Sequence, residues 1–217
     1  MLESYQPPLT PYLRIIYQDD ALIVLDKPSG LLTVPGRLAE HQDSLELRVR
    51  RVYPTARIVH RLDMATSGIV LMALSHEAQK HLNLQFEKRL TEKHYIARVE
   101  GVVAQQCGHI ELPMRCDWPN RPKQMVCFEH GKHALTAFKV LARETSATRV
   151  QLKPITGRSH QLRVHLQWLG HPILGDKFYA SPAGLAAAPR LQLHAAWLKF
   201  RHPISQQWLE FSSECPF

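Results

Sequence analysis

The chain has 217 residues and a formal net charge of +8, with 27 lysines and arginines against 19 aspartates and glutamates. This length can bury one substantial core, and the charge favours a polyanionic partner such as a nucleic acid without requiring one. No apolar run approaches the roughly 20 residues of a membrane-spanning helix, and residues 1–14 lack the pattern of an export signal, so we expect a cytoplasmic protein with no membrane partner.

The first part of the chain alternates strand and loop signals. After a proline-rich arm, apolar runs predict strands at 13–17 and 21–25, and a loop with prolines and glycines follows at 26–36. Asp43 or Ser44 can cap a short helix that carries Arg48, Arg50 and Arg51. The run 68–74 predicts a buried strand.

A helix capped by Ser75 is predicted next, with Ala78, Leu82, Phe86 and Leu90 facing the core at i+4 spacing. Strands are expected at 95–100, 135–141, 149–152, 191–200 and 207–211, and an exposed loop at 116–127. Ser159 is expected to cap another helix that Gly170 ends. Strands that follow one another directly indicate an α+β fold with a largely antiparallel or mixed sheet and flanking helices, in one domain over 1–217.

Several common sites are missing from the sequence. It has no phosphate-binding glycine loop, no H-E-x-x-H and no G-x-S-x-G. His130 and His133, or His160 and His165, can share a metal in principle, but neither pair has an obvious third ligand. The four cysteines form no C-x-x-C pair, so we expect reduced thiols. The sequence therefore predicts neither a metal nor a cofactor.

Asp63 is the most informative carboxylate, because it precedes an apolar run in the segment HRLDMATSG. Burying its charge is costly unless a cation or hydrogen-bond donors compensate it. Arg61 shares its face if the segment is extended, and otherwise an arginine from another segment must pair with it. Asp63 then either forms an ion pair that fixes a loop or serves as a nucleophile or base.

Four ordered motifs resemble those of the RluA family of RNA pseudouridine synthases. HRLDMATSG is similar to the family's H-R-L-D signature, and DKPSGLL at 26–32 is similar to its K-P-x-G-L element. KHYIA at 93–97 resembles K-x-Y-x-A, and ITGRSHQLRVH at 155–165 resembles T-G-R-x-H-Q-[IL]-R-x-H, with Gly175-Asp176 further on. The resemblance implies the pseudouridine synthase fold and the isomerisation of uridine in RNA without a cofactor.

The same resemblance implies the roles of individual residues. Asp63 is expected to be the catalytic carboxylate, acting on the sugar or the base, and Arg163 to hold it ionised. Tyr95 is expected to stack on the uracil and to assist proton removal from its carbon five. Arg61 is expected to fill the space that the flipped nucleotide leaves in the RNA. His60, Thr66 and Ser67 are expected to shape the loop.

Many relatives carry an extra RNA-binding domain ahead of the catalytic one, and its absence is expected here. RNA must then bind the surface of the catalytic domain, for which the candidates are Arg48, Arg50, Arg51, Arg121, Lys123 and Arg158. The segments 5–13, 116–127 and 175–195 resemble compact family members that modify 23S ribosomal RNA and the anticodon stem-loop of several transfer RNAs. The resemblance implies both substrates, and we expect a monomer.

Two other classes of protein remain open at this point. A non-catalytic RNA-binding or folding protein would have the same charge and the same arginines, and it would not need Asp63. A metal-dependent hydrolase would use His160 and His165 and lose activity to a chelator.

Overall fold

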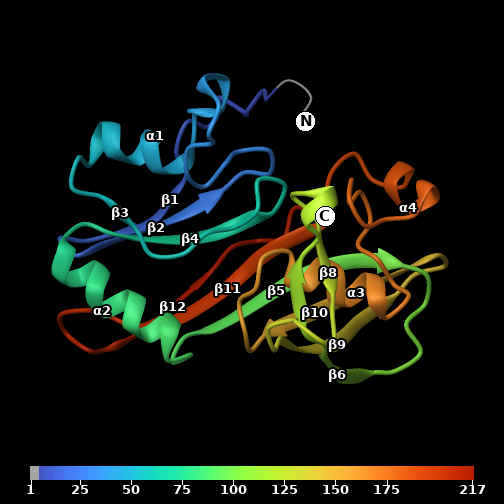
Figure 1. The fold of residues 1–217 in the computed structure, drawn as a ribbon. Helices are drawn as coiled ribbons and strands as arrows, with labels where there is room; N and C mark the ends of the chain where they lie inside the picture. Colours follow the sequence, from blue (N-terminus) through green and yellow to red (C-terminus); the bar gives the residue numbers. More distant parts are fainter. Residues whose placement is uncertain (1–4) are drawn as a thin grey trace. The chain divides into compact units, whose positions relative to one another are not determined.

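The computed structural model describes residues 5–217, which form two compact units. The first unit holds the chain up to Glu92 together with Ala195–Cys215, and the second holds Lys93–His194 with Pro216 and Phe217. Figure 1 follows the chain through both units.

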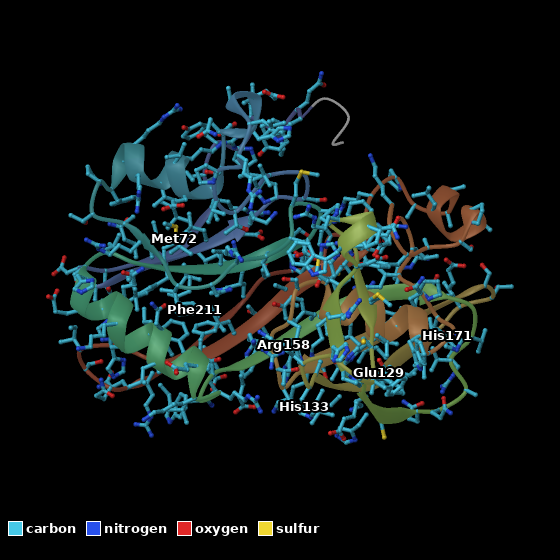
Figure 2. All side chains as sticks on the ribbon, viewed as in Figure 1. Met72, Glu129, His133, Arg158, His171 and Phe211 are labelled. Carbon is cyan, nitrogen blue, oxygen red and sulfur yellow. The ribbon has the colours of Figure 1, made fainter. Side chains whose placement is uncertain are left out.

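The first unit is built on strands in the order β1-β2-β4-β11, with β3 on β4 and β12 on β11. β4 lies inside the unit and all seven of its residues are buried, because it carries the apolar run that predicted a buried strand. Met72 of β4 and Phe211 of β12 are labelled in Figure 2. The strands are β1 (Ile15–Gln18), β2 (Leu22–Lys27), β3 (Arg57–Ile58), β4 (Ser67–Ala73), β11 (Leu193–Arg201) and β12 (Trp208–Ser212).

Two helices of the first unit begin at serine caps. The Ser44 hydroxyl accepts from Leu47 N at 3.3 Å at the start of α1 (Leu45–Val52), so Ser44 rather than Asp43 is the cap. The Ser75 hydroxyl accepts from Ala78 N at 3.1 Å at the start of α2 (His76–Glu87), as predicted. A short 3-10 turn, η1, spans Ala39–His41.

The predicted apolar face of α2 is confirmed at Ala78 and Leu82, which are fully buried in the core of the first unit. Phe86 packs against that core from its edge. Leu90 was predicted wrongly, because the helix ends at Glu87 and Leu90 is 52% exposed. Arg89, with φ of 57°, turns the chain away before the i+4 pattern is complete.

The second unit contains an antiparallel sheet in the order β5-β10-β9-β6. The predicted exposed loop at 116–127 is wrong in part, because β7 and β8 pair as a hairpin around the 3-10 turn η2. Both strands are only three residues long, which is too short for an alternating pattern to stand out, so periodicity did not reveal them. The elements are β5 (Glu92–Glu100), β6 (Cys107–Glu111), β7 (Met114–Cys116), η2 (Trp118–Asn120), β8 (Gln124–Val126), β9 (Leu135–Arg143) and β10 (Ala147–Pro154).

The helix α3 (Gln161–Trp168) lies in the second unit, where the sequence predicted it, but its predicted cap is wrong. The capping position is His160 rather than Ser159, with φ of 53° and no side-chain capping bond. Gly170, with φ of 84°, ends the helix as predicted. A further short helix, α4 (Pro182–Ala186), was not predicted.

These elements confirm the α+β class with a largely antiparallel sheet. In residues 5–217, every helix falls short of the length and apolar character that a membrane crossing requires. The four cysteines, all of which lie in this described range, form no disulfide bond with one another.

Candidate active site

Asp63 lies on an irregular segment between β3 and β4, four residues before β4 begins at Ser67. A turn follows it, in which Thr66 N donates to the Asp63 carbonyl at 3.1 Å. The Asp63 side chain is half-buried, and the neighbouring Arg61 is exposed. The carboxylate is therefore carried by a turn ahead of the strand.

A second loop, which follows β2, holds the backbone on both sides of Asp63. The Thr33 hydroxyl donates to the Leu62 carbonyl at 2.7 Å and accepts from Leu62 N at 3.2 Å. The Ser29 hydroxyl donates to the Ala65 carbonyl at 2.7 Å. Because the loop is bonded immediately before and shortly after Asp63, the position of the carboxylate is set by its backbone.

Lys27, at the end of β2, holds the same loop in place through hydrogen bonds from its buried ammonium group. Its side chain is fully buried, and its Nζ donates to the carbonyls of Pro28 and Leu31 at 2.8 Å and of Met64 at 3.0 Å. Three carbonyl dipoles compensate an ammonium that would otherwise be costly to bury. The residue that follows Asp63 is thus bonded directly to a cation.

His60 and Gly68 frame this segment structurally. His60 Nε2 accepts from Leu71 N at 3.0 Å, and its ring stacks on Phe86 with centroids 4.8 Å apart. Gly68 has φ of 111°, and a Cβ atom there would lie 2.3 Å from the Ala195 carbonyl oxygen of β11. Only glycine permits this close approach of β4 and β11. These contacts support the prediction that His60 shapes the loop.

Arg163 lies in the second unit, on α3, and is 3% exposed. Its Nε and Nη2 atoms donate to the two oxygens of Asp176, each at 2.7 Å. The rings of Phe178 and Tyr179 lie 5.2 and 5.1 Å from its guanidinium carbon. This bidentate pair fixes the guanidinium in one plane.

Asp176 was not predicted from the sequence as a partner of Arg163. The Gly175-Asp176 dipeptide was visible as part of the family pattern. Its contact with Arg163 spans 13 residues, however, and no local periodicity reports such a contact. The pairing of Arg163 with Asp63 stays a prediction.

Buried polar groups organise the loop ahead of α3. Gln161 accepts from the Thr156 hydroxyl at 2.7 Å and donates to the Thr136 hydroxyl at 3.0 Å. His165 Nδ1 lies 3.0 Å from the same Thr136 hydroxyl. Burial lowers the pKa of His165 from its ordinary value, which keeps the imidazole neutral near pH 7. These residues of the T-G-R-x-H-Q segment therefore hold the loop in place.

Tyr95 lies on β5 in the second unit, opposite Leu152 of β10. Its side chain is partly buried. Lys93 precedes it by two residues and so lies on the same face of the strand. Burial lowers the pKa of Lys93 from its ordinary value.

The predicted RNA-binding cations differ in accessibility. Arg48 was expected on the surface, but it is fully buried and makes a bidentate pair with Asp43 at 2.8 and 2.6 Å, so that expectation is wrong. Its guanidinium also lies 4.9 Å from the Tyr12 ring centroid and stabilises the N-terminal arm. An arginine on a short amphipathic helix is usually solvated, and for this reason Arg48 was predicted to be exposed.

The other candidates reach the surface. Arg51 is exposed and donates to the Tyr12 hydroxyl at 2.8 Å, and Arg121 is exposed over the Trp118 ring at 4.6 Å. Arg158 is exposed, and its Nε donates to the His133 carbonyl at 3.1 Å; both residues are labelled in Figure 2. Lys123 is partly exposed on the β7–β8 hairpin.

The histidine pairs weighed as metal ligands have other contacts. His160 Nδ1 lies 2.7 Å from the Tyr179 hydroxyl, and His165 is bonded to Thr136. Across residues 5–217, no three histidine, cysteine, aspartate or glutamate side chains gather in a way that could hold a metal ion.

The fold and the segments that carry the motifs are those of one class of protein, the RNA pseudouridine synthases. Residues 21–168 match the family model described as RNA pseudouridylate synthase, so the chain belongs to this family. The match spans Asp63, Tyr95 and Arg163 and confirms the predicted class of enzyme, an isomerase that acts on RNA.

Individual relatives are similar over the whole chain. The dual-specificity RNA pseudouridine synthase RluA of Escherichia coli K12 is 54% identical over 217 residues, which are 100% of this chain and 99% of the relative. The protein of that name from Vibrio cholerae is 54% identical over 208 residues, which are 96% and 84% of the two chains.

A solved structure supports the fold. The human RNA pseudouridylate synthase domain containing 1 superposes with a TM-score of 0.82 at 30% identity, covering 98% of this chain and 87% of its own.

Proposed function

We propose that this enzyme converts uridine to pseudouridine in 23S ribosomal RNA and in the anticodon stem-loop of transfer RNAs, with Asp63 as the catalytic carboxylate. The Asp63 loop carries this proposal, because hydrogen bonds from Lys27, Ser29 and Thr33 fix the backbone around a half-buried carboxylate. Relatives that are 54% identical along the full chain are named for dual RNA specificity, which supports the two substrates.

The proposed reaction needs no oxidant and no external group. The bond between C1′ and N1 of uridine breaks, uracil rotates, and C1′ bonds to C5; the C5 proton goes to solvent and N1 gains a proton. Asp63 stabilises or attacks the electron-poor sugar or base, and the positive charge of Arg163 keeps it ionised. Tyr95 stacks on the detached uracil, and Arg61 replaces the flipped nucleotide in the RNA.

Several finer features belong to the same proposal. The two compact units act together as one catalytic domain, and the protein works as a monomer in the cytoplasm, where both RNAs occur. The exposed cations Arg51, Arg121 and Arg158, with Lys123, contact phosphates. No metal or cofactor takes part.

Tritium release tests the proposed activity. RNA carrying tritium at C5 of uracil is incubated with the protein in the absence of added metal or cofactor, and release is expected with both 23S ribosomal and transfer RNA fragments. Asp63→Asn should abolish release while RNA binding is kept, because the change removes the charge and little volume. Absence of release from every RNA with the unmodified protein would refute the proposal.

Mapping of modified uridines tests the two substrates. In RNA from a strain that lacks the gene, pseudouridine should disappear at one 23S position and at one anticodon stem-loop position. It should return with a plasmid that carries the gene and not with one that carries Asp63→Asn. Loss in only one class of RNA would contradict the dual specificity.

A further inference from the structure

A groove of about 700 Å³ opens in the second unit between the β7–β8 hairpin and α3. The hairpin strand β8 lies beside α3 (Figure 1). The groove is lined by residues from three segments, among them Asp117, Lys123, Gln167, Trp168, Phe178 and Tyr179. The proposed catalytic residues Asp63, Tyr95 and Arg163 are not part of this lining.

The floor of the groove is a packed structure. Met114, Ala134, Val164 and Tyr179 form a buried cluster against which Phe178 packs. The Tyr179 hydroxyl accepts from Gln124 N of the hairpin at 2.8 Å and lies 2.7 Å from His160 Nδ1. One hydroxyl thus ties the hairpin to the start of α3, so the groove exists before a ligand binds.

Trp168 gives the groove an aromatic face. It occupies the last position of α3 and is 58% exposed, and the edge of the Phe128 ring contacts it at a centroid distance of 6.0 Å. In RNA-binding proteins, exposed aromatic rings such as this indole stack on unpaired bases.

The polar residues at the rim of the groove, Asp117 and Lys123, suit different parts of a nucleotide. One oxygen of Asp117, Oδ2, accepts from Asn120 Nδ2 at 3.0 Å, and Oδ1 has no hydrogen-bond partner among residues 5–217. A carboxylate repels phosphate but accepts hydrogen bonds from an amine. Lys123, on the same hairpin, has the charge that suits a neighbouring phosphate, and Arg121 lies close to it in sequence.

We propose that this groove binds one unpaired nucleobase of the RNA, additional to the target uridine, and that it prefers a base with an exocyclic amine. The base stacks on Trp168, its amine donates to Asp117, and Lys123 contacts the adjoining phosphate. Uracil has no exocyclic amine and is bound less tightly. This inference rests on the proposed function, because it takes RNA as the substrate.

Equilibrium binding tests the inference without turnover. Fluorescence anisotropy is measured with labelled pentaribonucleotides UUAUU, UUCUU and UUUUU, which differ only at the central base. The unmodified protein should bind the adenine and cytosine oligonucleotides more tightly than UUUUU. Trp168→Ala should weaken their binding about 5- to 100-fold, as expected for the loss of one stacked base.

Three further variants separate the causes. Trp168→Phe keeps an aromatic face and should bind nearly as the unmodified protein does, and Trp208→Ala removes a tryptophan of β12 that is 46% exposed and should change nothing. Asp117→Ala removes both acceptor oxygens and should bring the affinities for the three oligonucleotides together, even though removal of a negative charge strengthens all of them. Circular dichroism verifies that each variant is folded.

The outcomes also distinguish this inference from the proposed function. Equal affinities of the unmodified protein for the three oligonucleotides, or unchanged binding by folded Trp168→Ala, would refute the proposed nucleobase site. If tritium is still released in that case, the proposed enzymatic activity stands. If no tritium is released but the base preference is observed, the proposed enzymatic activity is refuted and the proposed nucleobase site stands. With substrate RNA, Trp168→Ala should raise KM and leave kcat unchanged.

Discussion

Lys27 places a positive charge inside the first unit, bonded to three carbonyl oxygens, one of which belongs to the residue after Asp63. Lys27→Met fills a similar volume but leaves the Pro28 and Leu31 carbonyls without this donor, whereas the Met64 carbonyl keeps its bond from Gly30 N at 2.9 Å. Each buried unsatisfied group costs about 1–3 kcal/mol. We expect Tm to fall by about 6–12 °C, for a loss of about 3 kcal/mol in a chain of this size.

The control for this prediction is Lys80→Met, which changes an exposed lysine of α2 in the same unit. It should leave Tm within a degree or so, because surface substitutions are usually near neutral. Differential scanning calorimetry measures both variants. Equal Tm values for the two would show that the Lys27 ammonium does not hold the loop.

His165 gives the molecule a pH dependence of known sign. Burial lowers its pKa in the folded protein, whereas in the unfolded chain the pKa is about 6.5. Below about pH 6.5 the unfolded state therefore binds a proton that the folded state does not, so the free energy of unfolding falls as the pH falls.

Urea unfolding between pH 7.5 and 5.5 measures this effect. His165→Asn keeps a polar group near Thr136 but does not titrate, and it should lose up to about 1.4 kcal/mol per pH unit of the dependence seen in the unmodified protein. All other titrating groups are common to the two proteins and cancel in the comparison. Parallel pH profiles would contradict the role assigned to His165.

At the scale of elements, the caps make opposite predictions for two serines. Ser75 accepts the Ala78 amide, whereas Ser159 is exposed and lies outside the capping position of α3. Ser75→Ala should cost about 1 kcal/mol of unfolding free energy and Ser159→Ala almost none. Urea titrations with equal m-values decide between them, and a comparable loss at Ser159 would restore the cap predicted from the sequence.

The elements that were predicted correctly are those in which the pattern of apolar side chains within the element shows which face is buried. The apolar run of β4 and the face with Ala78 and Leu82 were enough to find a strand and a helix. The hairpin was missed because β7 and β8 are three residues long each and are stabilised by contacts with distant residues such as Tyr179. The α3 cap was missed because a left-handed His160 takes the place of a serine cap.

At the scale of the whole molecule, the charge of +8 predicts salt-sensitive binding of RNA. Each phosphate contact contributes about 0.7–0.9 to the slope of log Kobs against log salt concentration. Arg121→Gln and Arg158→Gln should each reduce that slope by nearly one unit, and Lys80→Gln, on α2, should leave it unchanged. Anisotropy titrations from 50 to 300 mM salt with the substrate stem-loop give the slopes, and unchanged slopes in both arginine variants would remove these residues from the interface.

The candidate site was only partly predictable for a related reason. The resemblance to family motifs indicated Asp63, Tyr95 and Arg163, because each of these residues lies in a short segment that can be recognised from its own sequence. The bonds that fix these segments join distant residues, as Arg163 joins Asp176 and Lys27 joins Met64. Arg48 was likewise predicted to be a solvated cation, but its ion pair with Asp43 compensates its charge and allows it to be buried.

The ion pair between Arg163 and Asp176 is a zwitterion sealed in the interior of the second unit, with the two formal charges cancelling. Seen from a distance, it exerts little long-range pull on a polyanion. A sugar-phosphate chain is therefore attracted by solvent-facing cations such as Arg121 and Arg158 and not by this buried pair.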